Sequence, residues 1–132
     1  MIEPKIGKEV IFEKSFNSQD VVDFAKTTED NNMIHLDEEY AKDTMFGKRI
    51  VHGMLVASMF SKIFGTIYPG EGCLYYGQTL EFRKPVFLDT TIKAIATLIE
   101  FNDEKKIGVF KTEAFNEGGK LVINGEAKIV FP

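Results

Sequence analysis

The chain contains 132 residues, of which 44% are hydrophobic and twelve are phenylalanine. This length fits one domain with a sizeable core, since domains most often contain about 100–150 residues. The formal net charge is −4 and no block of basic residues occurs. That balance argues against nucleic-acid binding, which requires lysines and arginines massed on one face.

The cysteine count and the amino terminus indicate a cytoplasmic protein. Cys73 is the only cysteine, so no intrachain disulfide can form, and residues 1–5 lack the apolar segment of a secretory signal. Ser58, Ser61 and Lys62 interrupt the longest apolar run. We therefore predict no membrane-spanning helix, which would need roughly 18 consecutive apolar residues.

Residues 8–16 are predicted to be extended, and a short helix is predicted to follow as far as about Lys26. Asn17 or Ser18 suits the N-cap of that helix, and Asp20 lies in its first turn. The helix should therefore end just before a polar segment that begins near residue 29.

A second short helix is predicted from Asp37 through about Lys42. Its first turn would contain the acidic residues 37–39, and the helix macrodipole favours negative charge at that end. Residues 46–48, Phe-Gly-Lys, are predicted to break it.

A long helix is predicted from His52 to about Ile67, and residues 68–72 should end it. Apolar side chains cover most of its circumference, unlike the single apolar stripe of a surface helix. They are Met54, Leu55, Met59, Phe60, Ile63 and Phe64. This helix must therefore be covered on several sides.

The remainder of the chain is predicted to form long strands separated by turns. Polar, glycine-containing or charged segments at 102–105 and 116–120 favour hairpins, so the strands that flank them should pair antiparallel. The predicted strands cover residues 73–87, 90–101, 107–116 and 121–131.

This order of elements predicts an α+β fold in which an antiparallel, curved sheet wraps around a long central helix. Such a sheet keeps an exposed edge and an incompletely covered face. Pairing with a second copy would cover both, so we expect a homodimer or a higher homo-oligomer.

Two segments carry side chains or backbone groups suited to acyl chemistry. Asp30 and His35 lie five residues apart in a segment of low regular propensity, and a carboxylate with an imidazole can exchange protons. Gly53 opens the long helix, where backbone N–H groups remain free to face an anion. Together these groups indicate chemistry on an acyl carbonyl.

The same two segments resemble motifs of a known family. Residues 29–37, Glu-Asp-Asn-Asn-Met-Ile-His-Leu-Asp, contain the pattern D-x-N-x-x-H, and residues 50–55, Ile-Val-His-Gly-Met-Leu, follow at the usual distance. The sequence is similar to the MaoC-like family of hot-dog proteins, and within it to the short single-domain (R)-specific enoyl-CoA hydratases. The likeness covers nearly the whole chain, which implies one MaoC-like hot-dog domain over residues 1–132.

The resemblance implies that Asp30 and His35 are the catalytic pair and that they act on a trans-2-enoyl thioester. It also implies that Asn32 supports the loop geometry and that Ser61 lies near the pair. The N–H of Gly53 is our candidate donor to the thioester oxygen, where negative charge develops. We group Gly53, Asn32 and Ser61 as residues for oxyanion or substrate binding.

The resemblance is not complete. Members of the family often have proline at the position of Met33, and they commonly have Gly-Asp where this chain has Leu88-Asp89. The first difference implies a less rigid catalytic loop, and the second affects only a turn. Neither removes a group that transfers protons.

Structural roles compete with the functional ones. His52 has two readings, a contact with the substrate or catalytic loop and a brace for the turn before the helix, and Ser61 can simply bond back to a carbonyl. The pattern H-x-D…H is also seen in iron sites, but Asp37 is explained by the acidic first turn of a helix. Lys48 and Arg49 could approach a coenzyme phosphate, but we interpret them as solvated surface charge.

We therefore expect reversible hydration of trans-2-enoyl-CoA to (R)-3-hydroxyacyl-CoA, with no metal and no bound organic cofactor. The alternatives are a dehydratase for acyl-carrier-protein or for branched or dicarboxylic acyl-CoA substrates, a thioesterase, and a non-catalytic acyl-thioester-binding protein. A hot-dog thioesterase would need a carboxylate on or beside the long helix, and residues 52–67 contain none.

Overall fold

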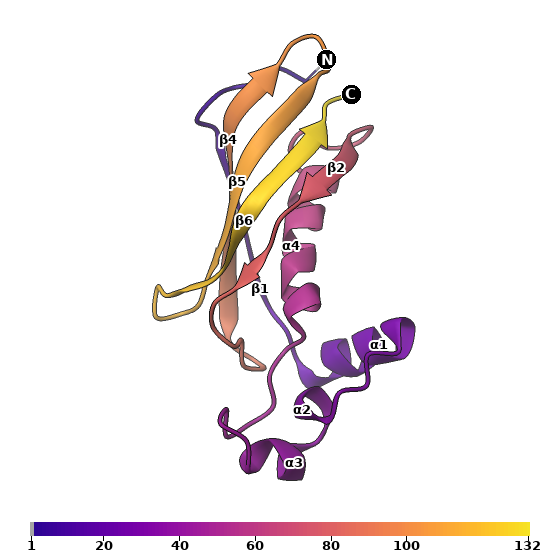
Figure 1. Cartoon of the computed structure of the whole chain (residues 1–132), viewed down its shortest axis with the longest axis vertical. Helices are drawn as coiled ribbons and strands as arrows, with labels where there is room; N and C mark the ends of the chain where they lie inside the picture. The colour runs from indigo at the N-terminus through magenta and orange to yellow at the C-terminus, as the bar shows by residue number, and fades with distance from the viewer. Residues whose placement is uncertain (1) are drawn as a thin grey trace.

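The computed structural model describes residues 2–132. A curved sheet lies against one long helix, and three shorter helices form a lobe at one end of that helix (Figure 1). The described elements are β1 (Glu9–Ser15), α1 (Ser18–Thr28), α2 (Met33–Leu36), α3 (Glu38–Lys42), α4 (Gly53–Thr66), β2 (Leu74–Gln78), β3 (Glu81–Phe82), β4 (Thr91–Asn102), β5 (Ile107–Phe115) and β6 (Leu121–Val130).

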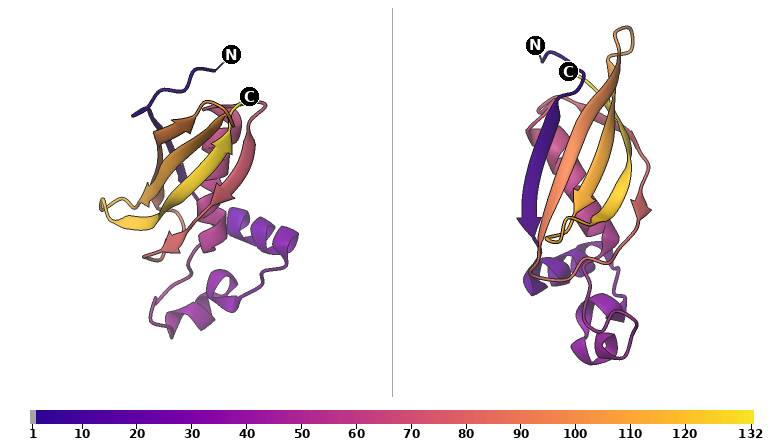
Figure 2. Two further views of the ribbon diagram at one scale, coloured as in Figure 1. Left: turned by 45° about the horizontal axis from the view of Figure 1, so that its top comes forward. Right: turned by 90° about the vertical axis from the view of Figure 1, so that its left-hand side faces the viewer.

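The sheet is antiparallel throughout, with the strand order β1-β4-β5-β6-β2, and β3 also pairs with β6. The two predicted hairpins are confirmed, because β4 pairs with β5 and β5 pairs with β6. The sheet curves around α4 (Figure 2).

Strand β4 shows why the sheet packs on the helix. Its alternate residues Ile92, Ala94, Ala96 and Leu98 are buried, because successive side chains of a strand point to opposite faces. The small alanines among them leave room for bulky groups that come from α4.

Helix α4 supplies those groups. Its buried residues are Val56, Ala57, Met59, Phe60, Ile63 and Phe64, and the Phe64 and Phe110 ring centroids lie 4.8 Å apart. Burying a large apolar side chain contributes about 1.5–3 kcal/mol to stability, so this helix anchors the core. The arrangement is the hot-dog fold, and the predicted fold class is confirmed.

The prediction of one continuous strand over residues 73–87 is wrong, because the chain there forms two separate strands, β2 and β3. The register of β2 against β6 shifts between Tyr75 and Gly77, and the backbone then approaches β6 so closely that a Cβ on Gly125 would overlap the carbonyl oxygen of Thr79. Pro85 has no N–H with which to extend the ladder. Such a long-range approach leaves no periodic signal in the sequence.

The lobe also differs from prediction. Helix α1 continues two residues beyond Lys26, to Thr28, and the segment before Asp37 contains the short helix α2 that the sequence did not predict. Helix α3 begins one residue after its N-cap Asp37, close to the predicted start.

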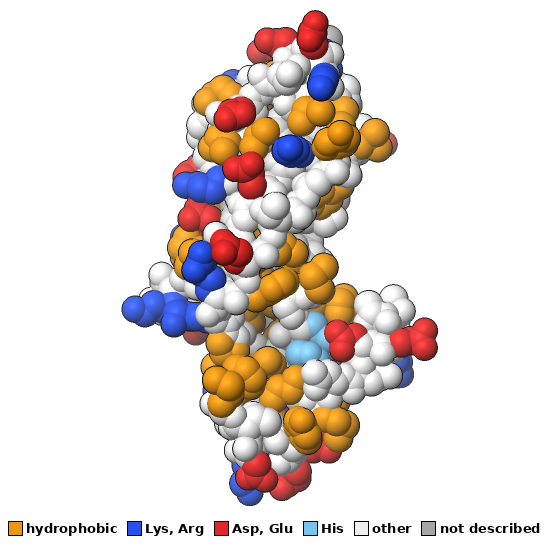
Figure 3. Space-filling model, in the orientation of Figure 1, with side chains coloured by type: hydrophobic (Ala, Val, Ile, Leu, Met, Phe, Trp, Pro, Cys, Tyr) orange, Lys and Arg blue, Asp and Glu red, His pale blue; other side chains and the backbone are white. Residues whose placement is uncertain are grey.

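One chain covers α4 only in part. Large apolar side chains remain exposed on α4, on β2 and on β3, where Figure 3 shows hydrophobic groups gathered. They are Met54, Leu74, Tyr75, Tyr76 and Phe82, with exposed fractions between 43% and 66%. None of the described helices has the length and apolar content needed to cross a bilayer.

Candidate active site

The end of helix α1 determines where Asp30 lies. A capping box fixes its start, since Asn17 Oδ1 accepts the Asp20 N–H at 2.9 Å and Asp20 Oδ2 accepts the Asn17 N–H at 3.0 Å. At the other end Glu29 adopts a left-handed conformation with φ of 65°, which terminates the helix. Asp30 follows directly, with its side chain exposed.

Helix α2 positions His35. The Asn32 Oδ1 accepts the Ile34 N–H at 3.2 Å and so caps this one-turn helix. Asn32 thus caps the helix that carries His35. It lies outside the cavity described below, so the structure places it as a support for the loop and not as a group that lines the site.

Hydrogen bonding sets the tautomer of His35. Its Nδ1 lies 2.8 Å from the carbonyl oxygen of Ile50, and because a carbonyl only accepts, Nδ1 carries the hydrogen. Nε2 is then the nitrogen that is free to take a proton. One carboxylate oxygen of Asp30 and one ring nitrogen each of His35 and His52 lie within 4.8 Å of one another. The predicted convergence of Asp30 and His35 is therefore present.

His52 braces the loop that carries Asp30. Its Nε2 donates to the backbone carbonyl of Asp30 at 3.1 Å, and its ring stacks on His35 with centroids 3.8 Å apart. Phe24 packs edge-on against the same His52 ring, with centroids 4.8 Å apart. His52 is only 2% exposed. Two roles were considered for His52, and the structure shows the contact with the loop that carries Asp30.

Burial lowers the pKa of His35 below its ordinary value of 6.5, and the nearby His52 ring acts in the same direction. The hydrogen bond to Ile50 and the carboxylate of Asp30 oppose that change but do not outweigh it. His35 is therefore neutral at pH 7, the state in which Nε2 can accept a proton.

Asp30 and His35 open into a cavity of about 460 Å³ between the lobe and the sheet. Figure 3 shows histidine atoms in a hollow there, with hydrophobic side chains beside them. The other lining residues are Phe46, Ile50, Val51, His52, Gly53, Met54, Val56, Phe82, Arg83, Lys84, Pro85, Val86 and Ile123. The cavity is thus mainly apolar with a few polar groups, as is usual for small-molecule sites.

Gly53 contributes the start of α4 to this cavity. No side chain among the described residues caps that helix end, so its first N–H groups remain available. A Cβ on Gly53 would lie 2.7 Å from the ring of Phe82. The absence of a side chain therefore keeps the helix start and Phe82 in contact.

Ser61, which the resemblance placed near the pair, does not line the same cavity as Asp30 and His35. Ser61 is exposed and lines a second cavity, of about 440 Å³, between α4 and β2. It lies eight residues after Gly53, which is about 12 Å along a helix at 1.5 Å per residue. Ser61 therefore belongs to a different part of α4 from the residues that face Asp30 and His35.

The cluster of Asp30, His35 and His52 has metal-ligating side chains, but the rings are poorly arranged for one ion. Ring nitrogens bind metals in the plane of the ring, and these two rings are stacked with an interplanar angle of 24°. One nitrogen of each is also paired with a carbonyl. Asp37, the carboxylate of the H-x-D pattern, instead caps α3 by accepting the Tyr40 N–H at 3.1 Å.

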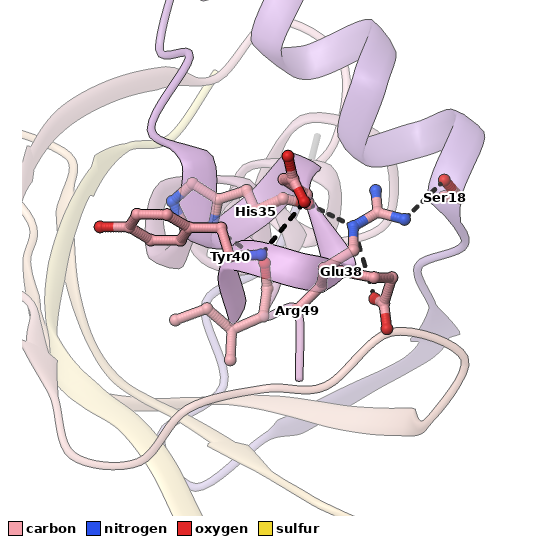
Figure 4. A network of polar contacts seen from close by, with 7 residues as sticks. Ser18, His35, Glu38, Tyr40 and Arg49 are labelled. Atoms are coloured by element: carbon pink, nitrogen blue, oxygen red, sulfur yellow. Dashed lines mark hydrogen bonds and ion pairs between the residues drawn. The ribbon is translucent and has the colours of Figure 1, made fainter. Parts of the chain in front are cut away.

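The interpretation of Arg49 as solvated surface charge is wrong. Its side chain is only 12% exposed, and its Nε donates to the backbone carbonyl of His35 at 2.7 Å (Figure 4). Ile50 was likewise not identified as a partner of the site. Both contacts depend on how the loop before α4 returns to α2, for which the sequence carries no local signal.

Known proteins share this architecture. A family model described as MaoC like domain matches residues 2–117. The (R)-specific enoyl-CoA hydratase of Aeromonas caviae is 38% identical over 97% of this chain and 96% of its own length. The mitochondrial 3-hydroxyacyl-acyl-carrier-protein dehydratase of Arabidopsis thaliana is 36% identical over 97% of this chain and 78% of its own length.

Among solved structures, the (R)-hydratase from A. caviae involved in PHA biosynthesis superposes with a TM-score of 0.96 at 38% identity. The match covers 98% of each chain. Sequence and structure thus agree over almost the full length, and the chain belongs to the MaoC-like family.

Proposed function

We propose that this protein catalyses the reversible hydration of trans-2-enoyl-CoA to (R)-3-hydroxyacyl-CoA. The observation that carries the proposal is the convergence of the Asp30 carboxylate and the His35 imidazole in one largely apolar cavity. The similarity to the (R)-specific hydratase of A. caviae supports the same reaction.

The reaction needs a base and an acid on one face of the double bond. In the proposed mechanism His35 Nε2 takes a proton from a water molecule while the water oxygen bonds to C3. The electron pair of the double bond moves to C2 and the thioester carbonyl. The imidazolium, stabilised by the Asp30 carboxylate, returns a proton to C2, so water is added without other reagents.

Negative charge on the thioester oxygen must be stabilised during this step. We assign that role to the N–H groups at the start of α4, which no side chain of the described residues caps and which border the cavity through Gly53. The positive end of the helix macrodipole adds to the effect. A preorganised donor of this kind typically contributes a factor of about 100–1,000 to kcat.

Coenzyme A is the expected carrier, and Arg83 and Lys84 offer cations beside the cavity for its phosphates. A dehydratase for acyl-carrier-protein substrates would use the same catalytic groups. Measurement of kcat/KM for crotonyl-CoA and for the same acyl group on acyl carrier protein distinguishes the two carriers. A higher kcat/KM with the carrier protein would replace the CoA assignment.

A second copy of the chain would cover the exposed apolar groups on α4, β2 and β3. We therefore propose a homodimer, for which a stable interface usually buries about 800 Å² on each partner. Sedimentation of the purified protein as a monomer would contradict it. The free thiol of Cys73 fits our proposal of a cytoplasmic location.

Loss of absorbance from the conjugated enoyl thioester tests the proposed activity. We expect turnover of crotonyl-CoA by the purified protein, and loss of turnover in Asp30→Asn and in His35→Ala with the fold retained. Release of free thiol instead would favour a thioesterase. Binding of the thioester with no change in absorbance would favour a non-catalytic binding protein, which needs neither Asp30 nor His35.

A further inference from the structure

Arg49 is a largely buried cation in the loop between α3 and α4, and the proposed mechanism gives it no part. Its neighbour Lys48 is exposed and lies over the Phe87 ring, whereas only 12% of the Arg49 side chain is accessible. A guanidinium loses hydration when it is buried, so it must be held by hydrogen bonds.

The Arg49 side chain joins all three helices of the lobe (Figure 4). Nε donates to the carbonyl of His35 at 2.7 Å, and Nη1 donates to Ser18 Oγ at 3.1 Å. A carboxylate oxygen of Glu38 lies 3.8 Å from Nε. Ser18 begins α1, His35 lies in α2 and Glu38 begins α3, so one side chain fixes the relative placement of the three elements.

The contact with His35 is the one closest to the chemistry. Helix α2 has only four residues, so it has little stability of its own and its last carbonyls lack partners within the helix. A hydrogen bond from a cation to a carbonyl is stronger than one between neutral groups. Arg49 therefore holds the backbone of His35 at a position where the helix itself cannot.

The next residue holds the His35 side chain. The Ile50 N–H donates to the Ile34 carbonyl at 3.3 Å, and the Ile50 carbonyl accepts from His35 Nδ1 at 2.8 Å. Residues 49 and 50 thus contact His35 at its carbonyl and at its ring. If the His35 backbone moved, the ring could not keep its bond to Ile50, and the tautomer that leaves Nε2 free would no longer be enforced.

We propose that Arg49 is a positioning residue for His35. Through the His35 carbonyl it keeps the imidazole in register with the Ile50 carbonyl, so that Nε2 faces the reaction in its unprotonated form. The inference rests on the proposed hydratase function for its kinetic consequence, but the geometry of His35 can be measured without turnover.

Three variants test the proposal kinetically. Arg49→Ala removes the cation and Arg49→Lys keeps the charge without the planar donor group, whereas Glu38→Gln weakens the ion pair and leaves the bond to His35 in place. We expect kcat for crotonyl-CoA to fall about 10-fold in both Arg49 variants with KM within about twofold, since a displacement of 1 Å in a reacting group can cost about 100-fold. Glu38→Gln should keep the kcat of the natural protein. Added guanidinium ion should restore part of the kcat of Arg49→Ala.

A full kcat in Arg49→Ala would overturn the proposal, because the cation and its bond to the His35 carbonyl would then be dispensable. Nitrogen NMR of the histidine rings supplies the second readout, and the chain has only two histidines to assign. We expect the Nδ1–H tautomer for His35 in the natural protein and a mixture of tautomers in the Arg49 variants. An unchanged His35 spectrum in folded Arg49→Ala would refute the positioning role, whereas absence of turnover by the natural protein would refute the hydratase proposal alone.

Discussion

The substitution Gly53→Ala probes the contact between the start of α4 and the cavity. A Cβ at this position would lie 2.7 Å from two atoms of the Phe82 ring, Cδ1 and Cε1. Carbon atoms in good contact are about 3.5–4.0 Å apart, so the ring must withdraw by about 1 Å. Both residues line the cavity, and the displacement therefore occurs where we place the substrate thioester.

The cost to folding should be small, because Phe82 lines the cavity and its ring has open space into which it can move. We expect the free energy of unfolding to change by less than about 1 kcal/mol, as is usual for a substitution outside the packed core. Catalysis should suffer more, since misplacement by about 1 Å can cost about 100-fold in rate. The expected kcat/KM for crotonyl-CoA is thus about 10–100-fold lower.

Gly65→Ala is the matched control. Gly65 lies in the same helix, and an added Cβ there meets no atom within 4 Å. Alanine inside a helix is favoured over glycine by about 1 kcal/mol, so this variant should be slightly more stable and fully active. Urea denaturation and the enoyl-absorbance assay measure both quantities. Equal kcat/KM in the two variants would refute the placement of the substrate at the start of α4.

His52→Phe removes the donor to the partly buried Asp30 carbonyl, and a fully buried carbonyl without a partner would cost about 1–3 kcal/mol. We expect kcat about 10-fold lower in His52→Phe, with a smaller loss in His52→Gln, whose amide can replace Nε2–H. Equal kcat values in the two variants would contradict a supporting role of the hydrogen bond from His52 to the Asp30 carbonyl. Asn32→Ala removes the cap of α2 and should cost about 1 kcal/mol of stability, whereas Asn32→Asp should not; calorimetry tells them apart. Because the pKa of His35 is lowered in the folded state, kcat/KM should be constant near neutral pH and fall only at pH values below 6.5. The unfolded chain then binds the extra proton, so unfolding free energy should also decline as pH drops below 6.5, and His35→Gln should weaken that decline.

The hot-dog arrangement and the proximity of Asp30 to His35 were predictable because their signals are local or periodic. The apolar circumference of α4 requires a covering sheet, and the hairpin turns at 102–105 and 116–120 fix how three strands follow one another. Asp30 and His35 were found through a short motif followed by residues 50–55. The structure brings these two groups together, as that motif implied.

Features that depend on long-range contacts were not predictable in this way. Helix α2 is too short to show periodicity and exists because Asn32 caps it. The break after β2 reflects the close approach of Thr79 to Gly125 on β6. Arg49 looks like any surface cation in the sequence, and its contacts with Ser18 and the His35 carbonyl join residues far apart in the chain. Ser61 lines a different cavity from Asp30 and His35.

The central claim is that Asp30 and His35 act as a unit on one water molecule. A double-mutant cycle with Asp30→Asn, His35→Gln and the combined variant, measured as kcat/KM for crotonyl-CoA, tests it most directly. We predict that each single change abolishes most of the activity and that the combined variant is scarcely worse than either. Losses that multiply in the double variant, or full activity in either single variant, would contradict the account.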